Sequence, residues 1–125
     1  MERRCYDRIR IDSECMFLIK SANDDSKEFS GQIVDICEGG IRLDVSFDCS
    51  SDTLSGLELG DSVFFQAYDE YMLNNEPRMD VFDGEAKIVR INRTENSTTM
   101  GCSISKSTDA FDTYLKNKRI SLYFS

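Results

Sequence analysis

The sequence contains no histidine among its 125 residues. Histidine is the commonest general base near neutral pH, and Ser-His and Cys-His nucleophilic pairs depend on it. The five cysteines form no C-x-x-C pair, so the usual Cys/His spacings of a zinc site are missing as well. We therefore expect no catalytic residue, no metal site, no cofactor and no enzymatic activity.

Long apolar runs are also missing. No run approaches the roughly 20 residues needed to cross a bilayer, and no apolar segment follows the start Met1-Glu2-Arg3-Arg4 as it would in a secretory signal. The odd number and irregular spacing of the cysteines do not suit a disulfide framework. We expect a cytoplasmic protein without membrane insertion, in which reduced thiols act as small core residues. The cysteines are Cys5, Cys15, Cys37, Cys49 and Cys102.

Basic residues are scarce in the middle of the chain. The formal net charge is −8, and residues 44–83 contain ten acids but a single basic residue, Arg78. Residues 1–10, in contrast, hold four arginines against two acids. An acidic body repels a nucleic-acid backbone, so we expect no DNA or RNA partner. A small anion site at the arginine cluster is compatible with this charge distribution.

The main pattern in the sequence is alternation with a period of two, which is typical of half-buried strands. It is clearest in 41–45 and in 99–105, and four further segments read as strands (14–20, 29–36, 62–68 and 85–92). Turn signals separate these segments. The sequence predicts one mostly-β domain over 1–125, a six-stranded antiparallel barrel, preceded by a flexible arginine-rich arm at 1–12. Residues 46–60 and 68–79, the latter with the only proline, read as surface connections.

One helix is predicted near the C-terminus, over 108–119. Phe111, Tyr114 and Leu115 share a face there, which we expect to pack on the barrel. Acidic residues lie at the start of this segment and basic residues at its end, an order that suits the helix dipole.

Two short motifs carry the functional signal. The first is Arg4-Cys5-Tyr6-Asp7-Arg8, an R-x-x-x-R directly preceded by Arg3, and the second is Asp35-Ile36-Cys37-Glu38-Gly39-Gly40. Their order, spacing and β context resemble the signature of the PilZ family, R-x-x-x-R followed by [D/N]-x-S-x-x-G. The resemblance covers roughly residues 3–125. It implies a six-stranded antiparallel barrel with a C-terminal helix, and a non-catalytic receptor for the bacterial second messenger cyclic di-GMP.

The chemistry of the ligand fits these residues. The Hoogsteen edge of guanine offers two acceptors that match a guanidinium fork, and arginine also stacks on purines and pairs with phosphate. The resemblance implies that Arg4 and Arg8 bind base and phosphate, while Asp35 accepts the N–H groups of a guanine Watson–Crick edge. Gly39 and Gly40 would let the backbone turn tightly beside the ligand.

Two positions refine this expectation. Cys37 occupies the serine position of the motif, and a thiol is a weaker hydrogen-bonding group than a hydroxyl. If the serine hydroxyl of the motif contacts the ligand, the thiol at this position would lower the binding free energy by on the order of 1 kcal/mol. Cys37→Ser should therefore keep or tighten binding. Arg3 resembles the residue of family members that bind two intercalated cyclic di-GMP molecules, and an extra cation would offset the added phosphate charge.

Three functions are compatible with the sequence. The first is a cyclic di-GMP receptor, binding one or two molecules, whose ligand-ordered arm changes a surface read by an unidentified protein partner. The second is a PilZ-like interaction module that has lost or weakened ligand binding. The third, an enzyme using carboxylates such as Asp35 and Glu38, would need a convergent placement and a perturbed pKa that the sequence does not indicate.

Overall fold

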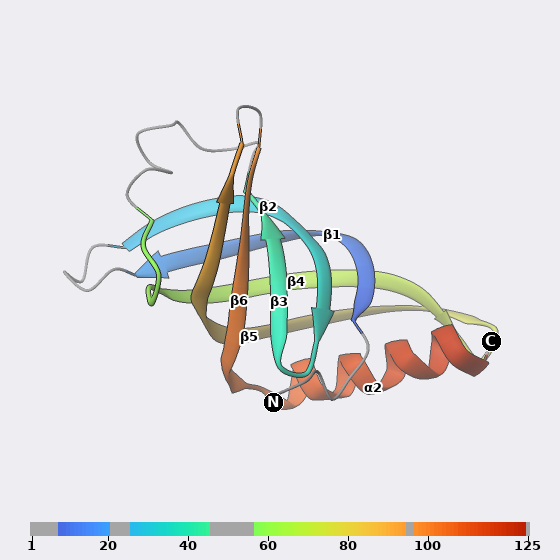
Figure 1. Ribbon diagram of the computed structural model, residues 1–125. Helices are drawn as coiled ribbons and strands as arrows, with labels where there is room; N and C mark the ends of the chain where they lie inside the picture. Colours follow the sequence, from blue (N-terminus) through green and yellow to red (C-terminus); the bar gives the residue numbers. More distant parts are fainter. Residues whose placement is uncertain (1–7, 21–25, 46–56, 95–96, 125) are drawn as a thin grey trace, which may run out of the picture.

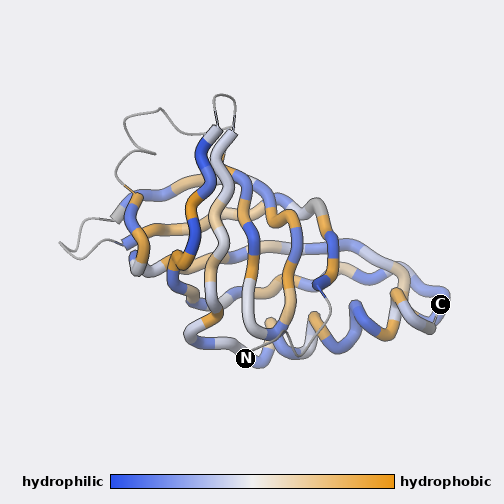
Figure 2. The backbone as a smooth tube through the Cα atoms, in the orientation of Figure 1, coloured by the Kyte–Doolittle hydropathy of each residue, from blue (hydrophilic) through white to orange (hydrophobic). Residues whose placement is uncertain are grey.

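Alternation of apolar and polar residues decides which face of each strand points into a closed barrel. The computed structural model describes residues 8–20, 26–45, 57–94 and 97–124, and Figure 2 shows the alternation along its strands. The strands are β1 (Ile9–Lys20), β2 (Ser26–Cys37), β3 (Gly40–Asp44), β4 (Ser62–Leu73), β5 (Glu76–Arg93) and β6 (Thr98–Ser107).

The strands close in the order β1-β2-β3-β6-β5-β4, and every neighbouring pair is antiparallel (Figure 1). The predicted fold class, a mostly-β six-stranded antiparallel barrel followed by a C-terminal helix, is confirmed. The helix, α2 (Asp109–Phe124), runs along one end of the barrel and on toward the tip of the β4–β5 hairpin (Figure 1).

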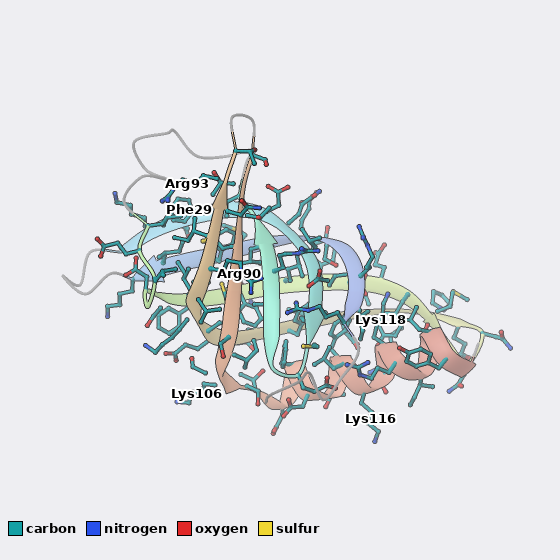
Figure 3. All side chains as sticks on the ribbon, in the orientation of Figure 1. Phe29, Arg90, Arg93, Lys106, Lys116 and Lys118 are labelled. Carbon is teal, nitrogen blue, oxygen red and sulfur yellow. The ribbon has the colours of Figure 1, made fainter. Side chains whose placement is uncertain are left out.

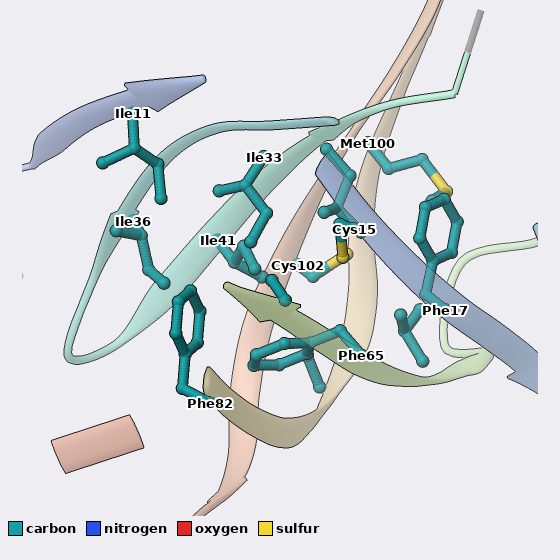
Figure 4. Close-up of a cluster of buried hydrophobic side chains, with 14 of the residues drawn as sticks. Ile11, Cys15, Phe17, Ile33, Ile36, Ile41, Phe65, Phe82, Met100 and Cys102 are labelled. Carbon is teal, nitrogen blue, oxygen red and sulfur yellow. The ribbon is translucent and has the colours of Figure 1, made fainter. Parts of the chain in front are cut away.

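The barrel interior is filled by inward-facing aliphatic and aromatic side chains (Figure 4). Phe17 stacks on Phe29 with ring centroids 5.7 Å apart. Burying a side chain of this size contributes about 1.5–3 kcal/mol, so these residues supply most of the driving force for closure. The cysteines that the structure describes, Cys15, Cys37 and Cys102, are free and buried, as predicted for small core residues. Cys5 and Cys49 lie outside the described residues.

The helix begins as predicted but is longer. The Thr108 hydroxyl oxygen caps it by accepting the Phe111 N–H at 3.1 Å, and Phe111, Tyr114 and Leu115 form the buried face. The Tyr114 ring stacks on Phe82 with centroids 4.1 Å apart. These contacts seal one end of the barrel.

The expected position of the basic residues at the helix end is wrong, because α2 continues to Phe124 and its last turn contains no basic residue. Lys118 pairs with a carboxylate of β4 and Arg119 with one in the β2–β3 turn, instead of with the helix dipole. Lys118 Nζ lies 2.9 Å from Asp69 Oδ2, and the same carboxylate oxygen accepts the Tyr114 hydroxyl at 2.6 Å. The charges therefore attach α2 to β4.

Residues 68–79 form no surface connection, contrary to the sequence prediction. They make the long tip of the β4–β5 hairpin, which turns at Asn74 and Asn75 with φ of 53° and 66°. This is the left-handed conformation of a two-residue hairpin turn, which asparagine tolerates. Pro77 lies opposite Met72 of β4, but β5 pairs with β6 only from Gly84 onward. The other edge of β5 is therefore open at Pro77, and an edge position tolerates the missing N–H.

One other segment also differs from the prediction. Residues 9–12, expected in the flexible arm, are the beginning of β1, where Ile9 and Ile11 are buried in the core. In the expected surface connection 46–60, the described residues 57–60 form no helix or strand, and residues 58–60 are exposed as expected. Leu57 alone is buried and anchors this segment to the core. Residues 1–7 and 46–56 lie outside the described residues.

Candidate functional site

Asp35 is the centre of the candidate site. A register shift in β2 between Ile33 and Asp35 turns this carboxylate toward the outer surface, while Ile36 points into the core. The Asp35 side chain is only 5% exposed. A carboxylate this buried requires compensation by hydrogen bonds or cations.

Two arginines provide that compensation from opposite sides. Arg8, directly before β1, places Nη1 2.7 Å from Asp35 Oδ1, and Arg42 of β3 places Nη2 2.6 Å from Asp35 Oδ2. Both guanidinium groups remain partly exposed. Each has five N–H donors, so each retains donors for a second anionic group.

The strand register continues this arrangement around the barrel. Arg10 faces Asp35, Asp35 faces Arg42, Arg42 faces Gly101, and Gly101 faces Arg90. Residues directly opposite one another across neighbouring strands share a face, and the three arginines in this series are exposed. Figure 3 labels Arg90 where β5 and β6 run side by side. We call Arg8, Arg10, Arg42 and Arg90 the arginine row.

Two arginines of the row have no described salt-bridge partner, and the strand position between Arg42 and Arg90 has no side chain. Arg10 and Arg90 form no salt bridge with any residue that the structure describes. Gly101, between Arg42 and Arg90, has no side chain, and a Cβ built there would meet only the Arg90 Cβ, at 3.5 Å. A planar or anionic group could therefore lie on the strand backbone between two guanidinium groups. In a chain of net charge −8, the row is a local concentration of positive charge.

The turn between β2 and β3 lies beside this row. Glu38 accepts two hydrogen bonds from Arg119 of α2, from Nη2 at 2.6 Å and from Nε at 3.1 Å. The Gly39 carbonyl accepts the Ile104 N–H at 3.0 Å. The turn is thus fixed to both the helix and β6.

The two glycines of the turn differ. Neither has φ in the left-handed region. A Cβ on Gly40 would approach the Cys102 carbonyl oxygen at 3.1 Å, whereas a Cβ on Gly39 would meet no atom within 4 Å. Packing therefore explains Gly40, while Gly39 leaves open space beside the motif.

The remaining predicted site residues are either almost fully buried or outside the described part of the chain. Cys37 lies opposite Gly40 at the end of β2 and is only 4% exposed, so little of its thiol faces solvent. Arg3 and Arg4 lie outside the described residues. The structure thus brings together Arg8, Asp35, Cys37 and the glycine turn.

Sequence reasoning missed the roles of Arg10, Arg42 and Arg90. Alternation in 41–45 indicates that Arg42 points outward, but the sequence does not show which residue it faces. Arg90 faces Gly101 only because of a second register shift, between Ile88 and Arg90. Such bulges leave little trace in a single sequence.

Two kinds of feature are missing from the described residues. No group of three or more metal-ligating side chains gathers among them. None of the described helices is long and apolar enough to span a membrane.

Comparison with known proteins gives the family and the fold. The family model described as the PilZ domain matches residues 2–117. Among curated proteins, none matches the sequence. The structure of the inhibitor of motility MotI/DgrA from Bacillus subtilis is 17% identical with a TM-score of 0.63, and the match covers 96% of this chain and 53% of that chain. This chain thus spans about half the length of MotI/DgrA.

A second solved structure is similar over most of its length. The PilZ domain of YcgR from Escherichia coli, a structure with c-di-GMP, is 16% identical with a TM-score of 0.58. The match covers 97% of this chain and 90% of that chain. At these identities the similarity concerns the fold.

Proposed function

The chain belongs to the PilZ domain family, and from this premise we propose that it is a non-catalytic receptor for cyclic di-GMP. The observation that carries the proposal is the pair of arginines, Arg8 and Arg42, held at 2.6–2.7 Å on one buried carboxylate. The ligand is a dianion with two guanines, and exposed guanidinium groups with donors to spare suit both parts of it. As a receptor for an intracellular messenger, the protein would act in the cytoplasm.

Asp35 has two roles in this proposal. Without ligand it orients Arg8 and Arg42, because both of its oxygens are paired. On binding, Arg8 moves to a phosphate or a guanine Hoogsteen edge, and Asp35 Oδ1 accepts the N1–H and N2–H groups of a guanine. Exchange of one hydrogen-bonded partner for another keeps the buried carboxylate satisfied throughout.

The arm supplies the rest of the site. Arg3 and Arg4 would close over the ligand from the segment before β1, and Gly39 and Gly40 would allow it to approach the β2–β3 turn. Cys37 would contribute only through the small exposed part of its thiol. Ordering of the arm would then change the surface that a protein partner reads.

The unpaired charges of the arginine row would suit a second ligand. Two cyclic di-GMP molecules carry four phosphate charges, and Arg10 and Arg90 are cations without a described salt-bridge partner. We propose that Arg90 and the Gly101 floor extend the site beyond the two sequence motifs. The chain would bind two ligands if this extension is occupied and one if it is not.

An interaction module without ligand binding is the second candidate. It is favoured by the full pairing of Asp35 and by the burial of Cys37. In that case Asp35, Arg8 and Arg42 would be a structural cluster, and any partner would bind elsewhere.

Isothermal titration calorimetry distinguishes the two candidates. We expect saturable heat with cyclic di-GMP, none with GMP at the same concentration, and at least tenfold weaker binding for Arg8→Ala. The matched control is Arg78→Ala, since Arg78 pairs with Asp80 on the hairpin and should leave the affinity unchanged. An absence of heat with the folded wild-type chain would favour the interaction module.

A further inference from the structure

Six large apolar side chains are exposed together on the outside of β1, β4 and β5. The register places Tyr68 opposite Val81 and Glu70 opposite Met79, so these outward residues form one continuous surface. We call it the β4–β5 face, and its apolar members are Met16, Phe64, Tyr68, Met72, Met79 and Val81.

The β4–β5 face contains a groove of about 690 Å³. It lies where β1 and β4 part, since their pairing ends at Cys15 and Ala67. Met16, Tyr68, Met79 and Val81 line it, with Glu14 at its rim. A contiguous exposed apolar surface with a polar rim marks an interaction site rather than scattered surface hydrophobes.

Three of the six apolar residues on this face are methionines. Met16, Met72 and Met79 are 54%, 50% and 57% exposed, whereas Met100 is fully buried in the core. The methionine side chain is flexible and polarisable, so a methionine-rich groove adapts to the apolar side chains of a partner.

Acidic residues lie at the groove and on the strands next to it. Glu14 lines the groove, and Glu70 lies opposite Met79. Glu28 and Glu85 line the neighbouring hollow with Asp83 and Lys106, and Lys106 lies opposite Glu85. None of the four glutamates forms a salt bridge with a described residue. The carboxylates outnumber Lys106, so the potential around the apolar centre is negative. The complement is a partner surface that is apolar in the middle and basic at the edges.

We propose that the β4–β5 face docks a basic amphipathic helix of a protein partner. The apolar stripe of such a helix would enter the methionine groove, and its lysines and arginines would pair with the surrounding glutamates. A helix satisfies its own backbone hydrogen bonds, so it needs only side-chain contacts from this face.

A second copy of the chain is a poorer occupant. Face-to-face pairing of two copies would place the same glutamates against one another, in chains that each carry a net charge of −8. An anionic membrane surface would be repelled for the same reason.

The face is separate from the arginine row. On β1, Met16 is six residues from Arg10, a distance of roughly 20 Å at about 3.3 Å per residue. Both surfaces can therefore be occupied at once, and the docking proposal does not rest on cyclic di-GMP binding.

The methionine methyl groups make the test direct. The full chain, labelled with ¹³C at the methionine methyl groups, is titrated with an 18-residue helical peptide that has leucines on one face and lysines on the other. The NMR signals of Met16, Met72 and Met79 should shift with saturation, while that of Met100 should not. The same peptide with glutamate in place of lysine should leave all of these signals unchanged.

Variants locate the contact. Replacement of Tyr68 and Met79 together by serine should weaken binding of the lysine peptide at least tenfold. The control, Val89→Ser, removes an equally exposed side chain outside the face and should change the affinity less than twofold.

Several results would overturn the proposal. These are an absence of shifts at the three surface methionines, equal binding of the glutamate peptide, or equal weakening by Val89→Ser. A concentration-dependent dimer in sedimentation, abolished by the Tyr68 and Met79 substitutions, would assign the face to a second copy and would also contradict it.

Discussion

Arg119 in α2 donates two hydrogen bonds to Glu38 in the β2–β3 turn, from Nη2 to Oε1 at 2.6 Å and from Nε to Oε2 at 3.1 Å. The two residues are 81 positions apart in the sequence. Glu38 lies inside the motif that ends at Gly40, so this pair connects the candidate ligand site to the helix. A two-point contact of this kind fixes orientation as well as distance.

Arg119→Met should destabilise the fold and loosen the turn. Both side chains are at most one-third exposed, so loss of the pair is expected to lower the free energy of unfolding by roughly 1–2 kcal/mol. Urea denaturation measures this loss. A double-mutant cycle with Glu38→Gln should show that most of it is shared, and additive losses from the two single variants would contradict a direct coupling.

Gly101→Thr should separate binding from stability. A Cβ at this position makes only an ordinary contact with Arg90, and a β-branched residue suits a strand, so stability should stay equal or rise by about 0.5–1 kcal/mol. The side chain would nevertheless fill the floor between Arg42 and Arg90, and we expect the Kd for cyclic di-GMP to rise at least tenfold.

Ser105→Thr, an exposed change on the same strand, is the matched control for Gly101→Thr and should alter neither property. Unchanged affinity of folded Gly101→Thr would remove β6 and β5 from the ligand site.

Cys37→Ser should keep or tighten ligand binding. A hydroxyl hydrogen-bonds more strongly than a thiol of similar shape, while the 4% exposure of Cys37 limits the gain to a few-fold. Calorimetry on the two proteins measures the difference. Clearly weaker binding by the serine variant would contradict this interpretation of the position.

The protein should lose stability at alkaline pH through two core thiols. Burial raises the pKa of Cys15 and of Cys102 from 9.0 to about 12. Their contribution to stability is fully present below pH 9, where the thiols are neutral in both states. It is lost between about pH 9 and 12, as the unfolded chain ionises first, with a slope of up to about 1.4 kcal/mol per pH unit for each thiol.

Denaturation at pH 8 and pH 10 tests the alkaline effect. The double variant Cys15→Ala, Cys102→Ala will be less stable at pH 8 because it leaves cavities, but its stability should fall less steeply with pH. An identical slope for wild type and variant would assign the alkaline loss to other groups.

The parts of the fold that depend on local pattern could be predicted from the sequence. Alternation gave the strand class, and Phe111, Tyr114 and Leu115 gave the buried face of the helix. The β4–β5 tip could not be predicted, since Asn74-Asn75 lacks the glycine that usually marks such a turn. The predicted end of the helix was wrong because Lys118 and Arg119 pair with carboxylates that are distant in the sequence. A single sequence does not show where those carboxylates lie.

The candidate site divides in the same way. The motifs indicate Arg8 and Asp35 because both lie in short contiguous segments. Arg42 and Arg90 join them through strand register, which is set by bulges in β2 and β5 and by closure of the barrel. Non-local pairing of this kind is a property of the whole chain and is not written in any one segment.

The most direct test of the central claim is a cyclic di-GMP titration followed by NMR of the arginine Nε–H groups. The signals of Arg8, Arg42 and Arg90 should shift and saturate together, at a stoichiometry of one or two ligands per chain. The signal of Arg78, which pairs with Asp80 on the β4–β5 hairpin, should stay in place. Saturable binding that leaves the signals of Arg8 and Arg42 unchanged, or no binding at all, would contradict the proposed site.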